Sequence, residues 1–538
     1  MEVGLDKTIA ILSKSRNDAA TAALLAALEA GEREVFSAVV RGLLQRRAKH
    51  GHAAVLQLWP TMDESQRALL EHGRGRISGA LRDAILASDD ALFASSCEII
   101  DRFNEYDLIA TLVNIAETPN SPRADAATTL TLKLTNRLNQ AMRQPREPGD
   151  RRDPTAMRRH ILESLQRSVE RFRSHKRSEL VEAYMVLAGA QSATLRSLLD
   201  SPHHPCFQVV LQALTLGDSD SIVGLLMDFL RFQNCPHVVR NVTSRRTDAK
   251  FIGALLELSL TGSNTAAAQN VSRIASFAFL SPPANLTQQL DERQQAAALR
   301  LAAASGLAAD LRLDLIDEAL DRGGADARCE AVRMLVKIPG DRSNQLIRVA
   351  LEDVHPEVQA AAARPLRERH VPGVMGKLIE LVSSPYPEVR DAAREGLSEF
   401  SLANFLSRFD ALEDTIRTST GHLVMQIDVH AVDGLIEELE APSRRRRMRG
   451  IRVAQAMGAL PKVSHLLLEF LEDEDHLLRA AAADALQHCT GLDVRDALLA
   501  ACADRSASVK NAAQESLHAL GVDPTLVANA IAAGDSPT

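Results

Sequence analysis

Apolar residues recur along most of this chain at positions i, i+3, i+4 and i+8, the spacing of one buried stripe on an α-helix. The clearest example is formed by Val389, Ala392, Ala393 and Leu397. Pro387 stands just before this stripe, and proline suits the first turn of a helix because its missing N–H is not needed there. Since a lone helix cannot bury such a stripe, the pattern predicts helices that stack on copies of themselves.

The sequence around Pro387 also occurs a second time, which indicates a repeat. Residues 355–362 read HPEVQAAA, and residues 386–393, which lie 31 positions later, read YPEVRDAA. Self-similarity at a fixed period of this size is typical of solenoids. Related stripes occupy residues 35–43 near the start and 509–517 near the end. We therefore expect an all-α protein, an α-solenoid of helix–turn–helix repeats of about 31 residues.

Breaks in this pattern divide the chain into six predicted segments. Pro154 should restart a helix after a loop rich in proline and arginine, and Pro365 should end its helix early because proline lacks the N–H of a helix interior. The segments are degenerate helical repeats at 1–136, the loop with an irregular helix at 137–177, clearer helix–turn–helix repeats at 178–400, an irregular helical segment at 401–440, further repeats at 441–522, and a terminal helix and tail at 523–538.

The composition is that of a soluble protein with few aromatic residues. Charged residues make up 25% and aromatic residues 3% of the chain, and the net charge is −8, so nothing draws the whole protein to nucleic acid. Six scattered cysteines form no disulfide framework, which favours a reducing compartment. The first residues do not have the pattern of a signal peptide, and no apolar run is long enough to span a membrane. We expect a cytoplasmic protein without a membrane partner.

Two stretches resemble HEAT repeats: residues 384–393 (SPYPEVRDAA) and 504–513 (DRSASVKNAA). The period is similar to that of the short repeats in the phycobilisome-lyase-type HEAT family. The resemblance implies an aspartate in the turn of each repeat and an arginine six residues later, which together form a structural ladder through the stack. The pairs that match here are Asp473 with Arg479 and Asp504 with Lys510.

One group of residues has the composition of a metal site. His203 and Cys206 lie about one repeat before Cys235 and His237, and four such N/S ligands could hold tetrahedral zinc. Both places are also ordinary turns between helices, each with a proline. We favour the turns and expect neither a metal nor another cofactor.

Arginine-rich stretches raise the alternative of nucleic-acid or phosphate-backbone binding. They lie at 143–177 and at 444–449, the second together with Arg452. Basic runs contact phosphates, but hardly any aromatic residue lies among these arginines to stack on bases. The alternative without nucleic acid is a solvated loop, together with a helix face whose arginines offset the charge of nearby acidic residues. We therefore keep nucleic acid as an alternative that we do not expect.

Catalytic motifs are not evident in the sequence. There is no His-Glu dipeptide, no Gly-x-Ser-x-Gly sequence and no phosphate-binding loop. The resemblance implies a second alternative, a bilin lyase or another enzyme with the HEAT fold, yet no pattern here indicates a tetrapyrrole pocket. We expect a protein that is not an enzyme.

The function favoured by the sequence is a scaffold or adaptor that binds another protein along the concave face of the solenoid, which the second helix of each repeat forms. Arginines between the stripe positions should face outward there and suit an acidic segment of the partner. The candidates are Arg333, Arg364, Arg394 and Arg479 on these helices and Arg444, Arg445, Arg446 and Arg447 at the start of one of them.

Overall fold

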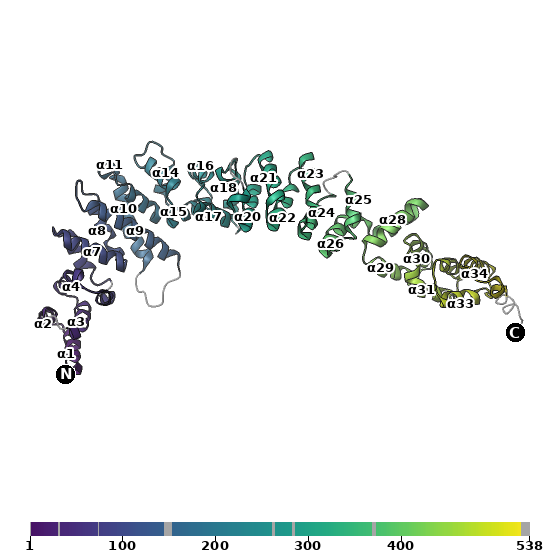
Figure 1. The fold of residues 1–538 in the computed structure, drawn as a ribbon, viewed down its shortest axis with the longest axis horizontal. Coiled ribbons are helices and arrows are strands. Elements are labelled where there is room, and N and C mark those ends of the chain that lie inside the picture. The colour runs from purple at the N-terminus through teal and green to yellow at the C-terminus, as the bar shows by residue number, and fades with distance from the viewer. Residues whose placement is uncertain are drawn as a thin grey trace. The chain divides into compact units, whose positions relative to one another are not determined.

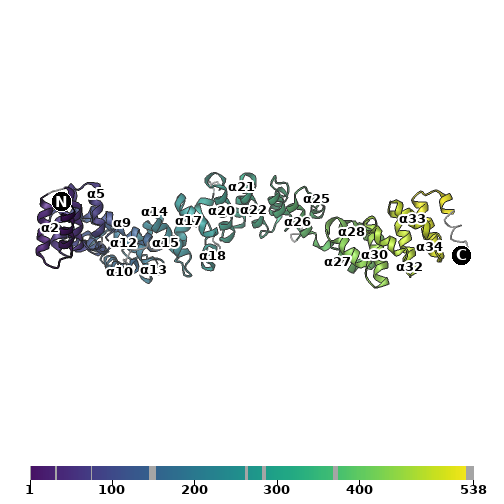
Figure 2. The same cartoon turned by 90° about the horizontal axis from the view of Figure 1, so that it is seen from below.

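The computed structural model describes residues 2–30, 33–73, 75–144, 153–260, 264–281, 286–367 and 373–528. The described residues form helices and turns and contain no strand, which confirms the all-α class. The chain divides into two compact units, residues 1–312 (unit 1) and 313–538 (unit 2). Within each unit the helices follow one another in chain order and pack against their neighbours (Figures 1 and 2), as predicted for an α-solenoid.

Unit 1 contains the α-helices α1 to α20, and α21 (Ala309–Arg322) begins just before unit 2. The bounds in unit 1 are α1 (Glu2–Lys14), α2 (Ala19–Glu29), α3 (Arg33–Gln45), α4 (Lys49–Gln57), α5 (Glu64–Ala68), α6 (Ser78–Leu86), α7 (Asp90–Phe103), α8 (Ile109–Ala116), α9 (Ala124–Arg143), α10 (Pro154–Glu170), α11 (Phe172–His175), α12 (Ser178–Ala188), α13 (Ala193–Leu199), α14 (Phe207–Leu216), α15 (Asp220–Leu230), α16 (His237–Arg245), α17 (Ala249–Leu260), α18 (Thr265–Ser272), α19 (Leu286–Gln289) and α20 (Glu292–Ala304).

Unit 2 contains the remaining named helices. Their bounds are α22 (Ala325–Leu335), α23 (Asp341–Ala350), α24 (Pro356–Ala363), α25 (Val374–Leu381), α26 (Pro387–Gly396), α27 (Leu402–Arg408), α28 (Asp414–Ile427), α29 (Ala431–Leu439), α30 (Arg444–Ala456), α31 (Ser464–Phe470), α32 (His476–Ala485), α33 (Leu492–Ala501) and α34 (Ala507–Ala519). Residues 524–528 are helical as well, and the predicted tail beyond them lies outside the described residues.

The predicted stripe is the core of unit 2. On α26, Val389, Ala392 and Ala393 have no exposed surface, and neither has Leu397 just after the helix. The small alanines let α24 and α26 pack closely, so that each stripe is covered by the next helix. Removing these apolar surfaces from water is the main favourable contribution to stacking. As predicted, α24 ends before Pro365.

The break in unit 1 begins later than the sequence pattern indicated. Instead of becoming irregular at Arg137, α9 continues to Arg143, because Leu138 extends its buried stripe and Arg137 donates to Asp101 and Asn104 of α7 and its end. The proline-rich loop at 145–152 lies outside the described residues. A helix does restart at Pro154, as predicted, and reaches His175 with an interruption at Arg171.

No single helix among the described residues is both long enough and apolar enough to span a membrane. One pair, α14 and α15 with Arg231, meets the length and composition criteria together, but its two helices are bent by 102° relative to each other.

Candidate functional site

Successive repeats of unit 2 are joined by arginines that bind aspartates in turns. We call the second helix of each repeat (α22, α24, α26, α30, α32 and α34) a B helix. Arg328 on α22 reaches the turn before α24, where its Nε lies 2.7 Å from Oδ2 of Asp353 and its Nη2 lies 3.2 Å from Oδ1. Asp353 also accepts the backbone N–H of His355 at 2.8 Å. One carboxylate thus fixes its own turn and holds the preceding helix.

The same arrangement recurs at the end of unit 2, one repeat further along than the resemblance implied. The Nε of Arg479 lies 2.9 Å from Oδ2 of Asp504. Arg479 also contacts Asp473, but there its Nη1 donates to the backbone carbonyl oxygen, at 2.8 Å, rather than to the carboxylate. The carboxylate of Asp473 instead binds Nη1 of Arg447 at 2.6 Å. The ladder therefore joins neighbouring repeats, while the contact within a repeat is to a carbonyl. Lys510 lies half-buried on α34.

Burial and hydrogen bonding shift the pKa of Asp504 in opposite directions. Burial alone would raise its pKa, but hydrogen bonds from Arg479 and from the backbone N–H of Ser506 outweigh burial and hold the pKa below its usual value. The carboxylate is therefore charged at neutral pH. Arg479 itself is 4% exposed, so the prediction that it faces outward is wrong: a position between stripe residues is covered when the next turn packs over it.

The arginine-rich start of α30 is held by carboxylates of the chain itself. Arg446 and Arg449 both bind the buried Glu438 of α29, at 2.7 and 2.5 Å. Arg444 binds Asp475 at 2.6 Å, while Arg445 is exposed and makes no ion pair within the described parts of the chain. Burial would raise the pKa of Glu438, but the two arginines lower it overall.

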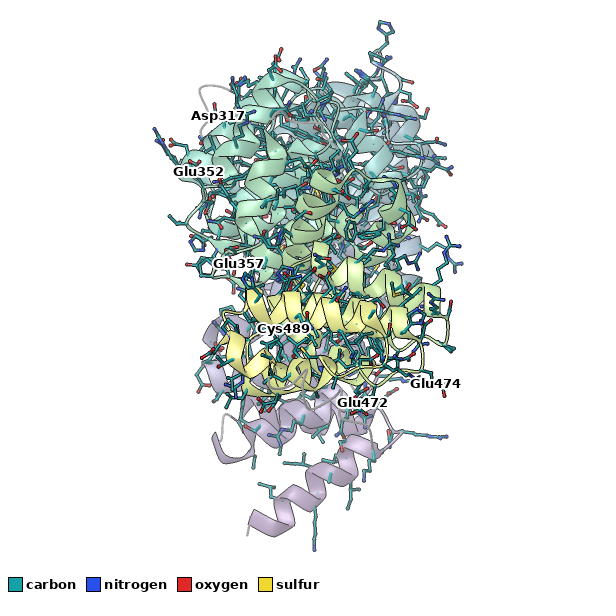
Figure 3. All side chains as sticks on the ribbon, turned by 90° about the vertical axis from the view of Figure 1, so that its right-hand side faces the viewer. Asp317, Glu352, Glu357, Glu472, Glu474 and Cys489 are labelled. Carbon is teal, nitrogen blue, oxygen red and sulfur yellow. The ribbon has the colours of Figure 1, made fainter. Side chains whose placement is uncertain are left out.

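The turn before α32 carries a small acidic surface. Glu472 and Glu474 flank Asp473 in sequence, are both exposed, and lie next to each other in Figure 3. Together with Asp475 they surround the point where Arg447 and Arg444 dock. This part of α30 is therefore an arginine–carboxylate contact between repeats, and it does not offer the free basic strip that a phosphate backbone needs.

The other predicted partner-binding arginines, Arg333, Arg364 and Arg394, each lie beside a carboxylate of the chain. Arg333 lies 2.8 Å from Glu330 of its own helix. Arg364 lies 3.2 Å from Glu395 on the next B helix, and Arg394 lies 3.5 Å from Asp391. A partner's acidic segment would have to replace these contacts.

The predicted metal candidates do not converge. His203 and His237 are exposed, whereas the thiols of Cys206 and Cys235 are buried and donate to the carbonyl oxygens of Val169 and Pro236. Burial raises the pKa of both thiols to about 11, which favours the protonated form rather than the thiolate that binds a metal. No group of three or more His, Cys, Asp or Glu side chains in the described parts of the chain is arranged to hold a metal.

Unit 1 contains buried arginines that the sequence analysis missed. Arg46 follows α3, and its guanidinium donates to the carbonyl oxygens of Leu12, Ser15 and Asn17 at 2.6–2.8 Å and to the hydroxyl of Thr21. These acceptors belong to α1, to the turn after it and to the start of α2.

Arg246 makes the equivalent contacts after α16. It donates to the carbonyl oxygens of Leu214 and Gly217, both at 2.9 Å, and to Asp248. Carbonyls at a helix end have no partner within the helix, and a cation is favourable there. The only sequence signal for both residues is an arginine pair at the end of one helix shortly before the next, at 46–47 and 245–246.

Comparison with known proteins supports the repeat assignment. A family model described as HEAT repeats matches residues 313–398, which begin where unit 2 begins. No curated protein matches the chain.

Among solved structures, Kap121p bound to Nup53p is 13% identical over 97% of this chain, with a TM-score of 0.24, and the chain spans about half (53%) of its length. A structure from work on the interaction between cadherin and β-catenin is 14% identical over 96% of this chain and 99% of that one, with a TM-score of 0.28. At TM-scores this low, neither likeness bears on function. The match of the family model shows that residues 313–398 are HEAT repeats, and the helices that pack in chain order show an α-solenoid fold.

Proposed function

We propose that this protein is a non-enzymatic scaffold or adaptor that binds a partner protein along the outward face of its B helices. The observation that carries the proposal is a row of exposed charged side chains at one helix position. Arg333, Arg364 and Glu395 follow one another at intervals of 31 residues. Arg333 lies on α22, Arg364 directly follows the end of α24, and Glu395 lies on α26.

This row suits protein recognition because it is rigid and continuous. The three B helices pack side by side, so a partner helix or extended peptide would meet one side chain of the row per repeat. Rim charges of this kind contribute mainly to partner choice and association rate.

The preference for an acidic partner segment belongs to the same proposal. Arg364 and Glu395 are 55% and 69% exposed, so their ion pair is solvated and adds little to stability. A carboxylate of the partner can therefore replace Glu395 at small cost. The proposal places the protein in the cytoplasm, where its six unpaired cysteines would stay reduced.

The test is an affinity pulldown from host lysate with the full chain, after nuclease treatment and at two salt concentrations. A matched variant carries Arg333→Glu, Arg364→Glu and Glu395→Arg, which changes the row and leaves the core intact. We expect one protein at near-stoichiometric level with the wild type and its loss with the variant.

Two results would contradict the proposal. One is retention of the same protein by the variant, which would place the contact elsewhere. The other is recovery of nucleic acid that is lost when nuclease is added or salt is raised, because salt dependence of that kind marks phosphate contacts.

A further inference from the structure

A hollow opens in unit 2 where the repeat pattern is irregular. It lies among α28, α30 and the short helix η8 (Leu486–His488), and its volume is about 590 Å³. Helices α28 and α30 pack against each other and are neighbours in Figure 1. The hollow is lined, among others, by Thr418, Arg452, Gln455, Pro461 and His488.

Close contact of the two helix backbones fixes this hollow. A Cβ atom at Gly421 of α28 would lie 2.4 Å from the carbonyl oxygen of Ala456 on α30, so only glycine permits this approach. Gly458 then turns the chain with a φ of +65°, a conformation that favours glycine. One turn before the contact, the long side chains of Arg417 and Arg452 frame the opening.

Arg417 is a fixed wall of the hollow. Its Nε donates to the carbonyl oxygen of Phe409 at 3.0 Å and its Nη2 to that of Leu412 at 2.7 Å, while Nη1 binds Asp414 at 2.6 Å. Its guanidinium lies 4.7 Å from the centre of the buried Phe409 ring. With every nitrogen engaged and its charge offset by Asp414, Arg417 is not available to a ligand.

Arg452, unlike Arg417, is available to a ligand. It lies over the same ring of Phe409 at 5.8 Å, is 55% exposed, and forms one ion pair, at 3.3 Å, with the equally exposed Asp410. Exposed pairs of this geometry contribute little to stability, so a ligand carboxylate can displace Asp410. Gln455 and His488 are exposed beside Arg452 and can donate further hydrogen bonds, and Pro461 offers an exposed apolar surface.

We propose that this hollow binds an acidic segment of the partner protein, in which a carboxylate pairs with Arg452 and an adjacent apolar side chain packs against Pro461. This inference rests on the proposed function and deepens it, because it names a second contact on the same face. Arg452 lies five positions after the ladder residue Arg447, as Arg333 lies five positions after Arg328, so it belongs to the same outward side of the B helices.

The test measures binding of the peptide fluorescein-Gly-Ser-Glu-Leu-Glu-Leu-Glu-Ser-Gly-amide to the full chain by fluorescence anisotropy. The matched probe replaces each Glu with Gln. We expect the Glu probe to bind about tenfold more tightly than the Gln probe at low salt, and this difference to shrink as salt screens the charges.

Two protein variants locate the binding. Arg452→Gln removes the cation, and Gln455→Trp fills the hollow without changing charge; each should weaken binding of the Glu probe about tenfold. Arg322→Gln is the control, because it removes an arginine of α21 that is 67% exposed and belongs neither to the hollow nor to the row of Arg333, Arg364 and Glu395. It should change the affinity by less than about twofold.

The inference is overturned if the Glu probe does not bind, if the Gln probe binds equally well, or if Arg322→Gln weakens binding as much as Arg452→Gln does. Suppose that the probes fail to bind, while the pulldown partner is retained by the wild type and lost by the variant with Arg333→Glu, Arg364→Glu and Glu395→Arg. This result would reject the binding site in the hollow and leave the proposed function standing. Failure of both would reject the proposed function as well.

Discussion

The contacts around Arg46 in unit 1 and those around Arg479 in unit 2 join neighbouring helix pairs with the same cation and different acceptors. Arg46 donates to three backbone carbonyl oxygens and one hydroxyl, all of them neutral. Arg479 donates to two carbonyl oxygens of its own turn and, across the repeat boundary, to the carboxylate of Asp504.

This difference has a physical consequence. The acceptors of Arg46 do not titrate, so its contacts hold at any pH at which the backbone is folded. The contact of Arg479 depends on an ionised aspartate, and the paired carboxylate must lose part of its interaction when protonated. Both arginines are buried, which makes either contact costly to remove from one side only.

The largest loss of stability is expected from Arg46→Ala. The substitution leaves three carbonyls and the Thr21 hydroxyl without the partner that Arg46 supplies, and should lower local stability at α1–α3 by about 3 kcal/mol. Hydrogen–deuterium exchange of α1 and α2 measures this. The neighbouring Arg47 is exposed, so Arg47→Ala is the matched control and should stay within about 0.5 kcal/mol. Equal effects of the two variants would refute the role of Arg46.

A somewhat smaller effect is expected from Asp504→Asn. Asparagine can still accept the N–H of Ser506, but Arg479 loses its counter-charge, which should cost about 2 kcal/mol at α32–α34. A double-mutant cycle with Arg479→Leu and Asp504→Leu isolates the interaction between the two side chains, and the double variant should cost less than the sum of the single ones. Strict additivity would mean that the two residues do not act as a pair. The exposed Asp493 on α33 provides a control, Asp493→Asn.

The smallest effect is expected from Arg364→Gln. Its pair with Glu395 is solvent-exposed on both sides, so the free energy of unfolding should change by less than about 0.5 kcal/mol. Denaturant unfolding followed by circular dichroism measures the change. A loss of stability comparable to that caused by Asp504→Asn would show that solvent exposure does not distinguish the weak ion pair of Arg364 from the strong ion pair of Arg479.

The core of unit 2 could be predicted from the sequence, whereas the contacts between repeats could only partly be. Val389, Ala392 and Ala393 are buried as predicted because a helix of period 3.6 can cover only one such stripe. The partner of Arg479 was placed six residues away and lies 25 residues away, because packing of the next repeat, which spacing within one repeat does not encode, brings Asp504 into reach.

The contacts of Arg46 and Arg246 could not be predicted at all from motif spacing. Their acceptors are carbonyl oxygens, and because every residue has one, no residue type marks such a site. The hollow beside Arg452 was likewise not visible in the sequence. Gly421, which permits the close contact of the two helices, lies in the segment predicted to be irregular (401–440), and Gly458, which permits the turn, lies in the predicted repeats that follow it. Its candidate cation, Arg452, was noted only as part of an arginine-rich stretch.

The most direct test of the comparison is hydrogen–deuterium exchange of the full chain at neutral pH and near pH 3, corrected for the intrinsic exchange rate. Because the pKa of Asp504 is lower in the folded than in the unfolded state, its contribution to stability is complete above the unfolded value of about 3.9 and is lost as the pH falls through the folded value. We expect protection of α32 and α34 to fall on acidification while that of α1–α3 next to Arg46 is kept. Equal loss in both regions, or loss confined to α1–α3, would contradict the account.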